Sequence, residues 1–253
     1  NLQKIFKFIS YGLFFKIYGK IENSINHNAD SRIIVKQINF DNSLSYNVYS
    51  IEGGRLYTDR VHDTAVLIDN NIIDKPSFQF RYTKNSEIYN SNVKNNIVFK
   101  KGTPRKLKTL NGSVLSLLTG GGGNNNYWHW LFDVLPRLYL CNQMIDLKDI
   151  NFFLIPDDIK RFQKETLDCL SIPKHKRLSS RIYRHIKATK LLTTDHPVVI
   201  SGNASKDIMR MPVWISQWLK DQFIKKKNFK KNKNKSRIYI DRSLQNSTDS
   251  PQR

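Results

Sequence analysis

A run of four glycines at 120–123 constrains the fold most strongly, because it separates an apolar segment from a helical pattern. The apolar run at 113–118 predicts a buried parallel strand. Glycines at a strand-to-helix turn let the backbone approach a ligand, and the following helix offers free N–H groups. No Gly-Lys-Ser/Thr follows, and the spacing is not that of a dinucleotide fingerprint, so neither phosphate-binding motif is present.

The rest of the chain divides into two patterns. Short alternating runs predict strands in a β-rich lead-in, at 32–35, 46–51, 64–68 and 96–99. Further on, apolar runs predict strands at 152–155, 188–192 and 198–200, and amphipathic patterns predict helices at 159–170 and 213–223. Strands that alternate with helices favour a parallel sheet with crossovers, so we expect an α/β fold.

The chain of 253 residues carries a formal net charge of +21. Such an excess of positive charge is typical of proteins with three classes of partner: nucleic acid, an anionic membrane surface and anionic small substrates. Eight of the thirteen residues at 225–237 are Lys or Arg, but only Phe229 is interleaved and no familiar nucleic-acid motif occurs. Lys, Asn and Ile are abundant throughout, as expected from an AT-rich genome, so nucleic acid is not the favoured partner.

The first residues predict a basic amphipathic helix. Such a helix can lie on a membrane surface or pack on its own domain, and the pattern leaves both possibilities open. No segment has the roughly 18 apolar residues of a membrane span. Cys141 and Cys169, the two cysteines, are most simply reduced core thiols, which favours a cytoplasmic protein.

The helix predicted after the glycines places three functional side chains together. His129, Asp133 and Arg137 are four residues apart, so they share one face of a regular helix. Pro136 either kinks this helix or opens its main part. A histidine, a carboxylate and an arginine could supply a base and an anion clamp, and the alternative is a polar network with structural value only.

The helix sequence at 126–138, Asn-Tyr-Trp-His-Trp-Leu-Phe-Asp-Val-Leu-Pro-Arg-Leu, closely resembles the signature of glycosyltransferase family 61. Bacterial members of this family are also described as capsular polysaccharide biosynthesis proteins. The segment at 165–170 resembles the family's next helix. The segment at 237–243 resembles its Arg-x-Tyr-Ile-Ser-Arg strand, with Asp241 in place of the serine. The resemblance covers roughly 110–253.

The resemblance implies a GT-B-like architecture, in which two Rossmann-like domains face each other across a cleft. The family's later motifs would follow Arg253, so we expect a fragment with only the first strand of the second domain. The predicted segments are a basic amphipathic leader at 1–24, a β-rich lead-in at 25–110, a Rossmann-like acceptor-side domain at 111–224, a Lys-rich linker at 225–236 and the start of a donor-side domain at 237–253.

The resemblance also implies inverting sugar transfer from a nucleotide-sugar to a glycan or lipid-linked glycan, with no cofactor and no metal. We expect Asp133 to act as the base, with His129 as the competing candidate, and apolar neighbours such as Trp130 to raise the pKa of the carboxyl. Arg137 would orient Asp133 or hold the acceptor. Arg242 would contact the donor diphosphate.

The aromatic residues beside the glycines are the remaining substrate-binding candidates. Trp128 and Tyr127 could stack on a sugar ring, and Asn126 could bind substrate at the same turn. We expect a cytoplasmic enzyme of bacterial surface polysaccharide synthesis, peripheral at the inner face of the membrane. The alternative is a basic nucleic-acid-binding or membrane-surface module without catalysis.

Overall fold

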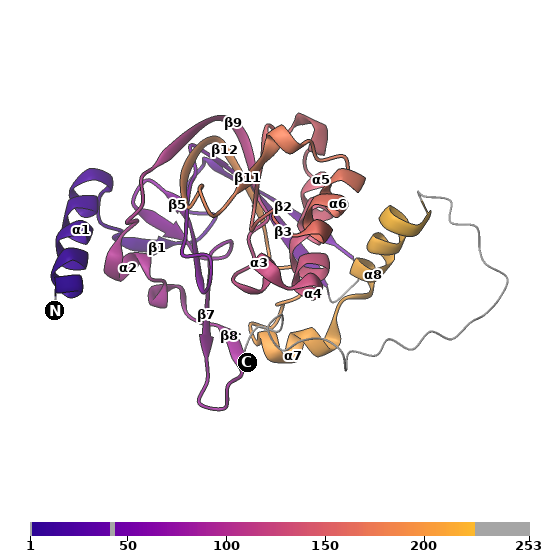
Figure 1. Cartoon of the computed structure of the whole chain (residues 1–253), viewed down its shortest axis with the longest axis horizontal. Coiled ribbons are helices and arrows are strands. Elements are labelled where there is room, and N and C mark those ends of the chain that lie inside the picture. The colour runs from indigo at the N-terminus through magenta and orange to yellow at the C-terminus, as the bar shows by residue number, and fades with distance from the viewer. Residues whose placement is uncertain (1, 41–43, 226–253) are drawn as a thin grey trace.

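The computed structural model describes residues 2–40 and 44–225. These residues form a mixed α/β structure on a twelve-stranded sheet. Figure 1 shows helix α1 (Leu2–Tyr18) at one end of the sheet and the helices α5 (Pro136–Asn142), α6 (Arg161–Cys169) and α8 (Val213–Lys220) on the other side. The predicted α/β class is therefore confirmed.

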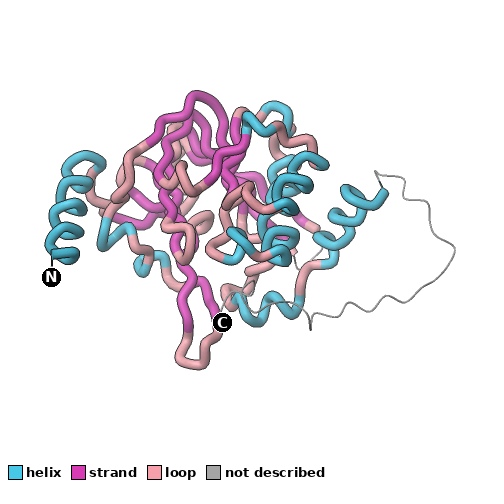
Figure 2. The backbone as a smooth tube through the Cα atoms, viewed as in Figure 1, coloured by secondary structure: helices cyan, strands magenta, loops and turns pink. Residues whose placement is uncertain are grey.

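Twelve strands make up the sheet within the described residues (Figure 2). The first eight are β1 (Asn23–Ile25), β2 (Ile33–Asn39), β3 (Ser45–Glu52), β4 (Arg55–Thr58), β5 (Asp63–Ile68), β6 (Asn71–Ile73), β7 (Phe78–Tyr82) and β8 (Ile88–Asn90). The last four are β9 (Lys108–Ser116), β10 (Phe152–Ile155), β11 (Arg177–Ser179) and β12 (His185–Thr194). Their order is β1-β6-β5-β4-β12-β9-β10-β11, with β3 paired with β12, β2 paired with β3, and the β7–β8 hairpin paired with β5 through β7.

The later strands form a parallel group. β12, β9, β10 and β11 are parallel neighbours, whereas β12 pairs antiparallel with β3 and β4. The predicted strands at 113–118, 152–155 and 188–192 are confirmed by this group, and those at 32–35, 46–51 and 64–68 by β2, β3 and β5. Since β9 runs through residue 110 and β12 joins both groups, the predicted lead-in and the Rossmann-like segment share one sheet.

The strand predicted at 96–99 is wrong. Asn96 directly follows the helical turn η1 (Val93–Asn95), Ile97 directly precedes α2 (Val98–Lys101), and residues 98 and 99 lie in α2. The Asn92 side chain accepts from the Lys94 amide, and Gly102, at a φ of 60°, ends the second turn. A short apolar run does not distinguish strand from helix, and here the asparagine cap and the glycine stop favour helical turns.

The strand predicted at 198–200 is also wrong, because side chains take up its backbone donors. The His196 Nδ1 atom accepts from the amides of Val198 and Val199, and the Asp207 carboxylate accepts from those of Ile200 and Ser201. A neighbouring strand is therefore not needed to satisfy these groups.

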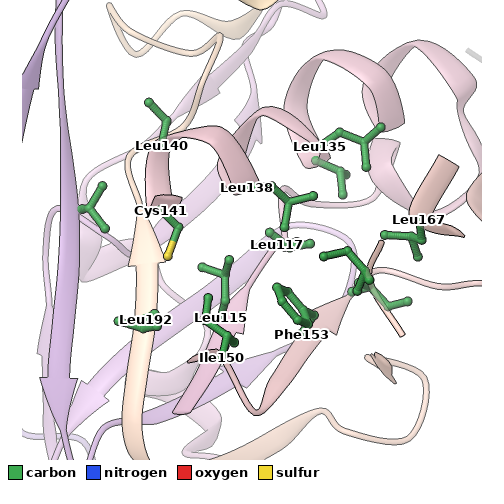
Figure 3. Close-up of a cluster of buried hydrophobic side chains, with 14 of the residues drawn as sticks. Leu115, Leu117, Leu135, Leu138, Leu140, Cys141, Ile150, Phe153, Leu167 and Leu192 are labelled. Carbon is green, nitrogen blue, oxygen red and sulfur yellow. The ribbon is translucent and has the colours of Figure 1, made fainter. Parts of the chain in front are cut away.

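Helices cover the parallel group, as the amphipathic patterns predicted. α6 and α8 confirm the helices expected at 159–170 and 213–223. Trp214 and Trp218 both lie against Tyr139 of α5, at ring-centroid distances of 5.4 and 6.2 Å. Figure 3 shows apolar side chains of α5, including the fully buried Cys141, directed at Leu115 of β9 and its neighbours. This core fixes α5 on the parallel strands.

The second half of α1 lies against its own domain. Phe15 contacts the backbone at Gly102, and the Tyr18 hydroxyl accepts a hydrogen bond from the Leu107 amide at 2.9 Å. Leu13 and Ile17 are more than half exposed on the opposite side. Within the described part of the chain, no helix has the length and hydropathy required to cross a membrane.

Candidate active site

The glycine turn that follows β9 is held against the turn between β4 and β5. The Gly121 amide donates to the Val61 carbonyl at 2.9 Å, and the Asn124 side chain donates to the Arg60 carbonyl at 2.8 Å. Gly120 has a φ of 87°, a conformation that favours glycine. Two segments far apart in the sequence thus fix the position of the short helix α3 (Gly122–Asn125).

The predicted helix begins as expected but is not regular. The Asn126 side chain accepts from the amides of Trp128 and His129 and so caps α4 (Tyr127–His129). A π-helical turn, η2 (Trp130–Val134), follows, and Pro136 stands at the first turn of α5. Proline clashes with the carbonyl four residues before it, and the wider turn relieves this clash. Pro136 therefore opens the main part of the helix, one of the two predicted possibilities.

His129 and Asp133 form a closely hydrogen-bonded pair, as their spacing predicted. The distance from His129 Nδ1 to Asp133 Oδ2 is 2.6 Å. Because the carboxylate accepts from Nδ1–H, the free electron pair of the neutral ring lies on Nε2. The His129 side chain is 29% exposed, whereas that of Asp133 is 6% exposed. This arrangement suits proton abstraction by a histidine whose tautomer an acidic residue sets.

Glycine at 122 is required by the His129 ring. A Cβ atom built on Gly122 would lie 2.5 Å from His129 Cδ2 and 2.9 Å from Nε2, closer than real contacts allow. The imidazole therefore lies directly on the backbone of the glycine turn. Gly122 therefore leaves room for the His129 ring beside the turn, a role that the sequence alone did not specify.

A second histidine approaches the same carboxylate from the end of β12. His196 Nε2 lies 3.9 Å from Asp133 Oδ2 and 3.3 Å from Thr119 Oγ1. Since its Nδ1 atom accepts from the backbone amides of residues 198 and 199, the proton of the neutral ring is on Nε2. Burial lowers the pKa of His196 to about 3. His196 is therefore a neutral donor directed at Thr119 and Asp133.

Arg137 lies beneath this group. Its Nη1 atom donates to the carbonyl and hydroxyl oxygens of Thr194, and the residue is 2% exposed. Burial lowers the pKa of Arg137 to about 10, and the charges of Asp133 and Asp195 oppose this shift. Among the described residues, neither the buried Nε atom of Arg137 nor the buried Oδ1 atom of Asp133 has a hydrogen-bond partner. The charge of Asp133 thus acts on Arg137 without a hydrogen bond between these two described residues, and both predicted roles of Arg137 stay predictions.

The aromatic candidates lie on different sides of the helix start. The Trp128 ring contacts that of His129 at a centroid distance of 5.1 Å, and Tyr127, 54% exposed, contacts Phe162 at 5.1 Å. Trp130 is fully buried and donates to Thr166 Oγ1. The structure therefore brings Trp128 to the His129 ring, while Arg242 and the segment at 237–243 lie outside the described residues.

Sequence reasoning missed His196 and Thr119. Both follow the carboxyl ends of parallel neighbours, β12 and β9, and ligand sites of open α/β sheets lie at such ends. Applied to the sequence, that rule could have indicated that residues 195–197 lie close to the glycine turn. A cavity of about 370 Å³ is lined in part by Arg137, Thr194 and His196.

Comparisons with family models, with curated proteins and with solved structures found no match for this chain. Among the residues that the structure describes, no group of three or more His, Cys, Asp or Glu side chains is arranged to hold a metal ion.

Proposed function

We propose that this protein is an inverting glycosyltransferase that moves a sugar from a nucleotide-sugar to a glycan acceptor. The observation that carries the proposal is the 2.6 Å contact of His129 Nδ1 with Asp133, which leaves Nε2 free at a glycine turn. The motif at 126–138, with its resemblance to glycosyltransferase family 61, supplies the reaction class. In this proposal His129 is the base and Asp133 its positioning residue, which reverses the order of preference from the sequence.

The reaction then proceeds in one displacement. His129 Nε2 takes the proton of the acceptor hydroxyl, and the oxygen attacks the anomeric carbon of the donor. The bond from that carbon to the diphosphate breaks with its electron pair, and the configuration inverts. The Asp133 carboxylate holds the proton of Nδ1 and stabilises the imidazolium that forms.

The buried neighbours have supporting roles in this scheme. His196 donates from Nε2 toward Thr119 and Asp133, and Arg137 contributes a positive charge below the carboxylate. Arg137 presents a positive charge, and His196 an N–H group, to the carboxylate that positions His129. Trp128 borders the ring of His129 and is the better placed of the two aromatic candidates to meet a sugar.

The proposal also includes the more detailed expectations drawn from the sequence and its family resemblance. The protein would have a GT-B-like arrangement with a second, donor-side domain, in which Arg242 contacts the diphosphate and no metal takes part. It would build surface or capsular polysaccharide in the cytoplasm, at the inner face of the membrane. The partly exposed side of α1, with Leu13 and Ile17, is compatible with contact to an anionic membrane surface.

The test measures release of nucleoside diphosphate from a panel of nucleoside-diphosphate sugars, with oligosaccharide acceptors, by the full-length protein. His129→Gln should lower kcat by about 10²–10⁴-fold with KM little changed, because general base catalysis contributes about that much. Asp133→Asn should also lower kcat strongly, since an amide cannot set the tautomer in the same way. The exposed His175→Gln serves as the matched control and should retain full turnover.

The two variants also separate the candidate bases. If Asp133→Asn abolishes transfer and His129→Gln keeps most of it, then Asp133 is the base, as first expected. If the wild type releases no nucleoside diphosphate from any sugar donor, or both variants keep normal turnover, the proposal is wrong.

A further inference from the structure

A large groove lies between α1, the loop after α2 and the β7–β8 hairpin. Its volume is about 1170 Å³, and Tyr11, Lys101, Arg105, Phe80 and Tyr82 are among its lining residues. Sites for single small molecules are usually about 300–1,000 Å³, so this groove is large enough for an extended ligand.

The carboxylates of the groove are already engaged within the protein. Asp59 Oδ1 accepts from the backbone amides of residues 61, 62 and 63 at 2.8–2.9 Å. Asp63 is 4% exposed and forms an ion pair with Arg81 at 2.9 Å. Asp63 is thus paired with Arg81, whereas the charge of Asp59 remains and acts on the nearby Arg184.

Five further cations line the groove without a carboxylate partner among the described residues: Lys100, Lys101, Arg105, Lys106 and Arg184. Arg184 is held by the carbonyls of Thr58 and Asp59, and its pKa is lowered by burial and then by the nearby Arg105. Lys100, Arg105 and Lys106 are exposed. Clustered like charges without an ion-paired carboxylate among the described residues favour an anionic ligand.

Aromatic side chains line the same groove as these cations. Tyr11, Phe14, Tyr57, Phe80, Tyr82 and Tyr89 all line the groove. Tyr82 is 61% exposed, and its ring lies at right angles to that of His62, 6.1 Å away. Such rings offer large apolar faces with a polar tip, and these suit a ligand that has flat apolar faces and many hydroxyl groups.

One wall of the groove is shared with the candidate active site. Phe80 lines the groove, and its ring lies 6.0 Å from that of His196. The same ring lies 3.2 Å from a Cβ atom built on Gly120, in the glycine turn. A ligand in the groove therefore lies beside the turn against which the His129 ring is placed.

We propose that this groove binds an acidic glycan, whose carboxylate or phosphate groups meet Lys100, Arg105 and Lys106 and whose sugar rings lie on the aromatic side chains. The acceptor role of this glycan rests on the proposed transferase function. A glycan is favoured over a single-stranded nucleic acid because one wall of the groove, Phe80, also contacts the glycine turn of the proposed transferase site.

The test measures direct binding to the full-length protein with three ligands: hexagalacturonate, the neutral maltohexaose and a single-stranded hexathymidylate. Hexagalacturonate should bind most tightly, and its affinity should fall as salt rises. The double variant Arg105→Gln/Lys106→Gln should raise its Kd about fivefold to tenfold, as expected for two exposed ion contacts. Tyr82→Ala should raise the Kd for hexagalacturonate as well.

The matched control removes two exposed lysines away from the groove, in Lys164→Gln/Lys174→Gln. It should leave the Kd within twofold. An equal loss in this control, equal binding of maltohexaose, or tighter binding of hexathymidylate with the same sensitivity to the groove variant would each overturn the proposal. Because binding is measured without turnover, an inactive protein that still binds hexagalacturonate in this pattern would contradict only the transferase function.

Discussion

Strand β12 has a histidine near each end, one fully buried and one with a side chain 10% exposed, and the two differ in tautomer and in surroundings. His185 is the first residue of the strand, and His196 lies two residues beyond its last. Burial lowers the pKa of His185 to about 4 and that of His196 to about 3, so both rings are neutral near pH 7. Their neighbours, however, give the two ends of the strand different roles.

At the first end, His185 takes part in a structural network. Its Nδ1–H donates to the Arg105 carbonyl at 2.9 Å, and its Nε2 atom accepts from buried Arg55 at 3.3 Å. Tyr18 of α1 meets the ring edge-on, at a centroid distance of 4.9 Å. Arg55 is further held by the Asp69 carbonyl. The contacts here tie α1 and the loop after α2 to the sheet.

At the other end, the proton of the His196 ring is on the opposite nitrogen. Nδ1 accepts from two backbone amides, so Nε2–H points to Thr119 and Asp133. A carboxylate, a second histidine and a buried arginine gather here, at the carboxyl ends of the parallel strands. A buried histidine alone therefore does not mark a site, whereas one at this edge beside an incompletely bonded carboxylate does.

The largest expected effect concerns stability and tests whether both histidines are neutral in the folded state. Their folded pKa values lie below the unfolded value of about 6.5, so the unfolded chain binds more protons at acidic pH. The stabilisation is complete above pH 6.5 and is lost as the pH falls toward 4 for His185 and 3 for His196. Between pH 7 and pH 5, each histidine should remove about 2 kcal/mol from the free energy of unfolding.

Urea unfolding at pH 7 and pH 5 measures this loss. His185→Gln and His196→Gln should each reduce the difference between the two pH values by about 2 kcal/mol, whatever their effect at neutral pH. If only one variant reduces the difference, then only that end of β12 excludes protons when folded, and the two ends are not equivalent in this respect.

The next effect concerns the carboxyl end alone. Gly122→Ala would force a methyl group into the His129 ring, so either the ring or the turn must move. In the proposed reaction, kcat should fall by about 10²-fold, because a displacement of about 1 Å can cost that much. Gly12→Ala in α1 meets no atom within 4 Å and is the control, with unchanged turnover. Normal turnover in Gly122→Ala would show that the ring position is not critical.

Local sequence rules predicted the parts of this site that depend on neighbouring residues. The four-residue spacing placed His129 beside Asp133, and the glycine run marked the turn on which the histidine ring lies. The apolar runs predicted β9, β10 and β12, because strands buried on both faces need continuous apolar side chains. The lead-in strands were predicted by their alternation.

Features that depend on tertiary contacts were not predictable in this way. His196 reaches Asp133 only because β12 pairs with β9, and no local pattern specifies that pairing. The strand expected at 198–200 failed because the side chains of His196 and Asp207 satisfy its amides. The π-helical turn before Pro136 left the contact between His129 and Asp133 intact, although the expected helix was regular.

The smallest effects compare one hydrogen bond at each end of β12. Thr119→Val removes the hydroxyl that faces His196 Nε2, and Tyr18→Phe removes the hydroxyl that accepts from the Leu107 amide. Each variant should lower the free energy of unfolding by about 1 kcal/mol, since each loses one hydrogen bond of a partly buried group. Only Thr119→Val should also lower kcat, by a few fold, because the Nε2–H group of His196 then has only the more distant Asp133 as a partner. Urea unfolding and turnover measured on the same two preparations separate these outcomes.

A loss of kcat in Tyr18→Phe equal to that in Thr119→Val would mean that the two ends of the strand are coupled, and that the division between a structural and a functional end is wrong.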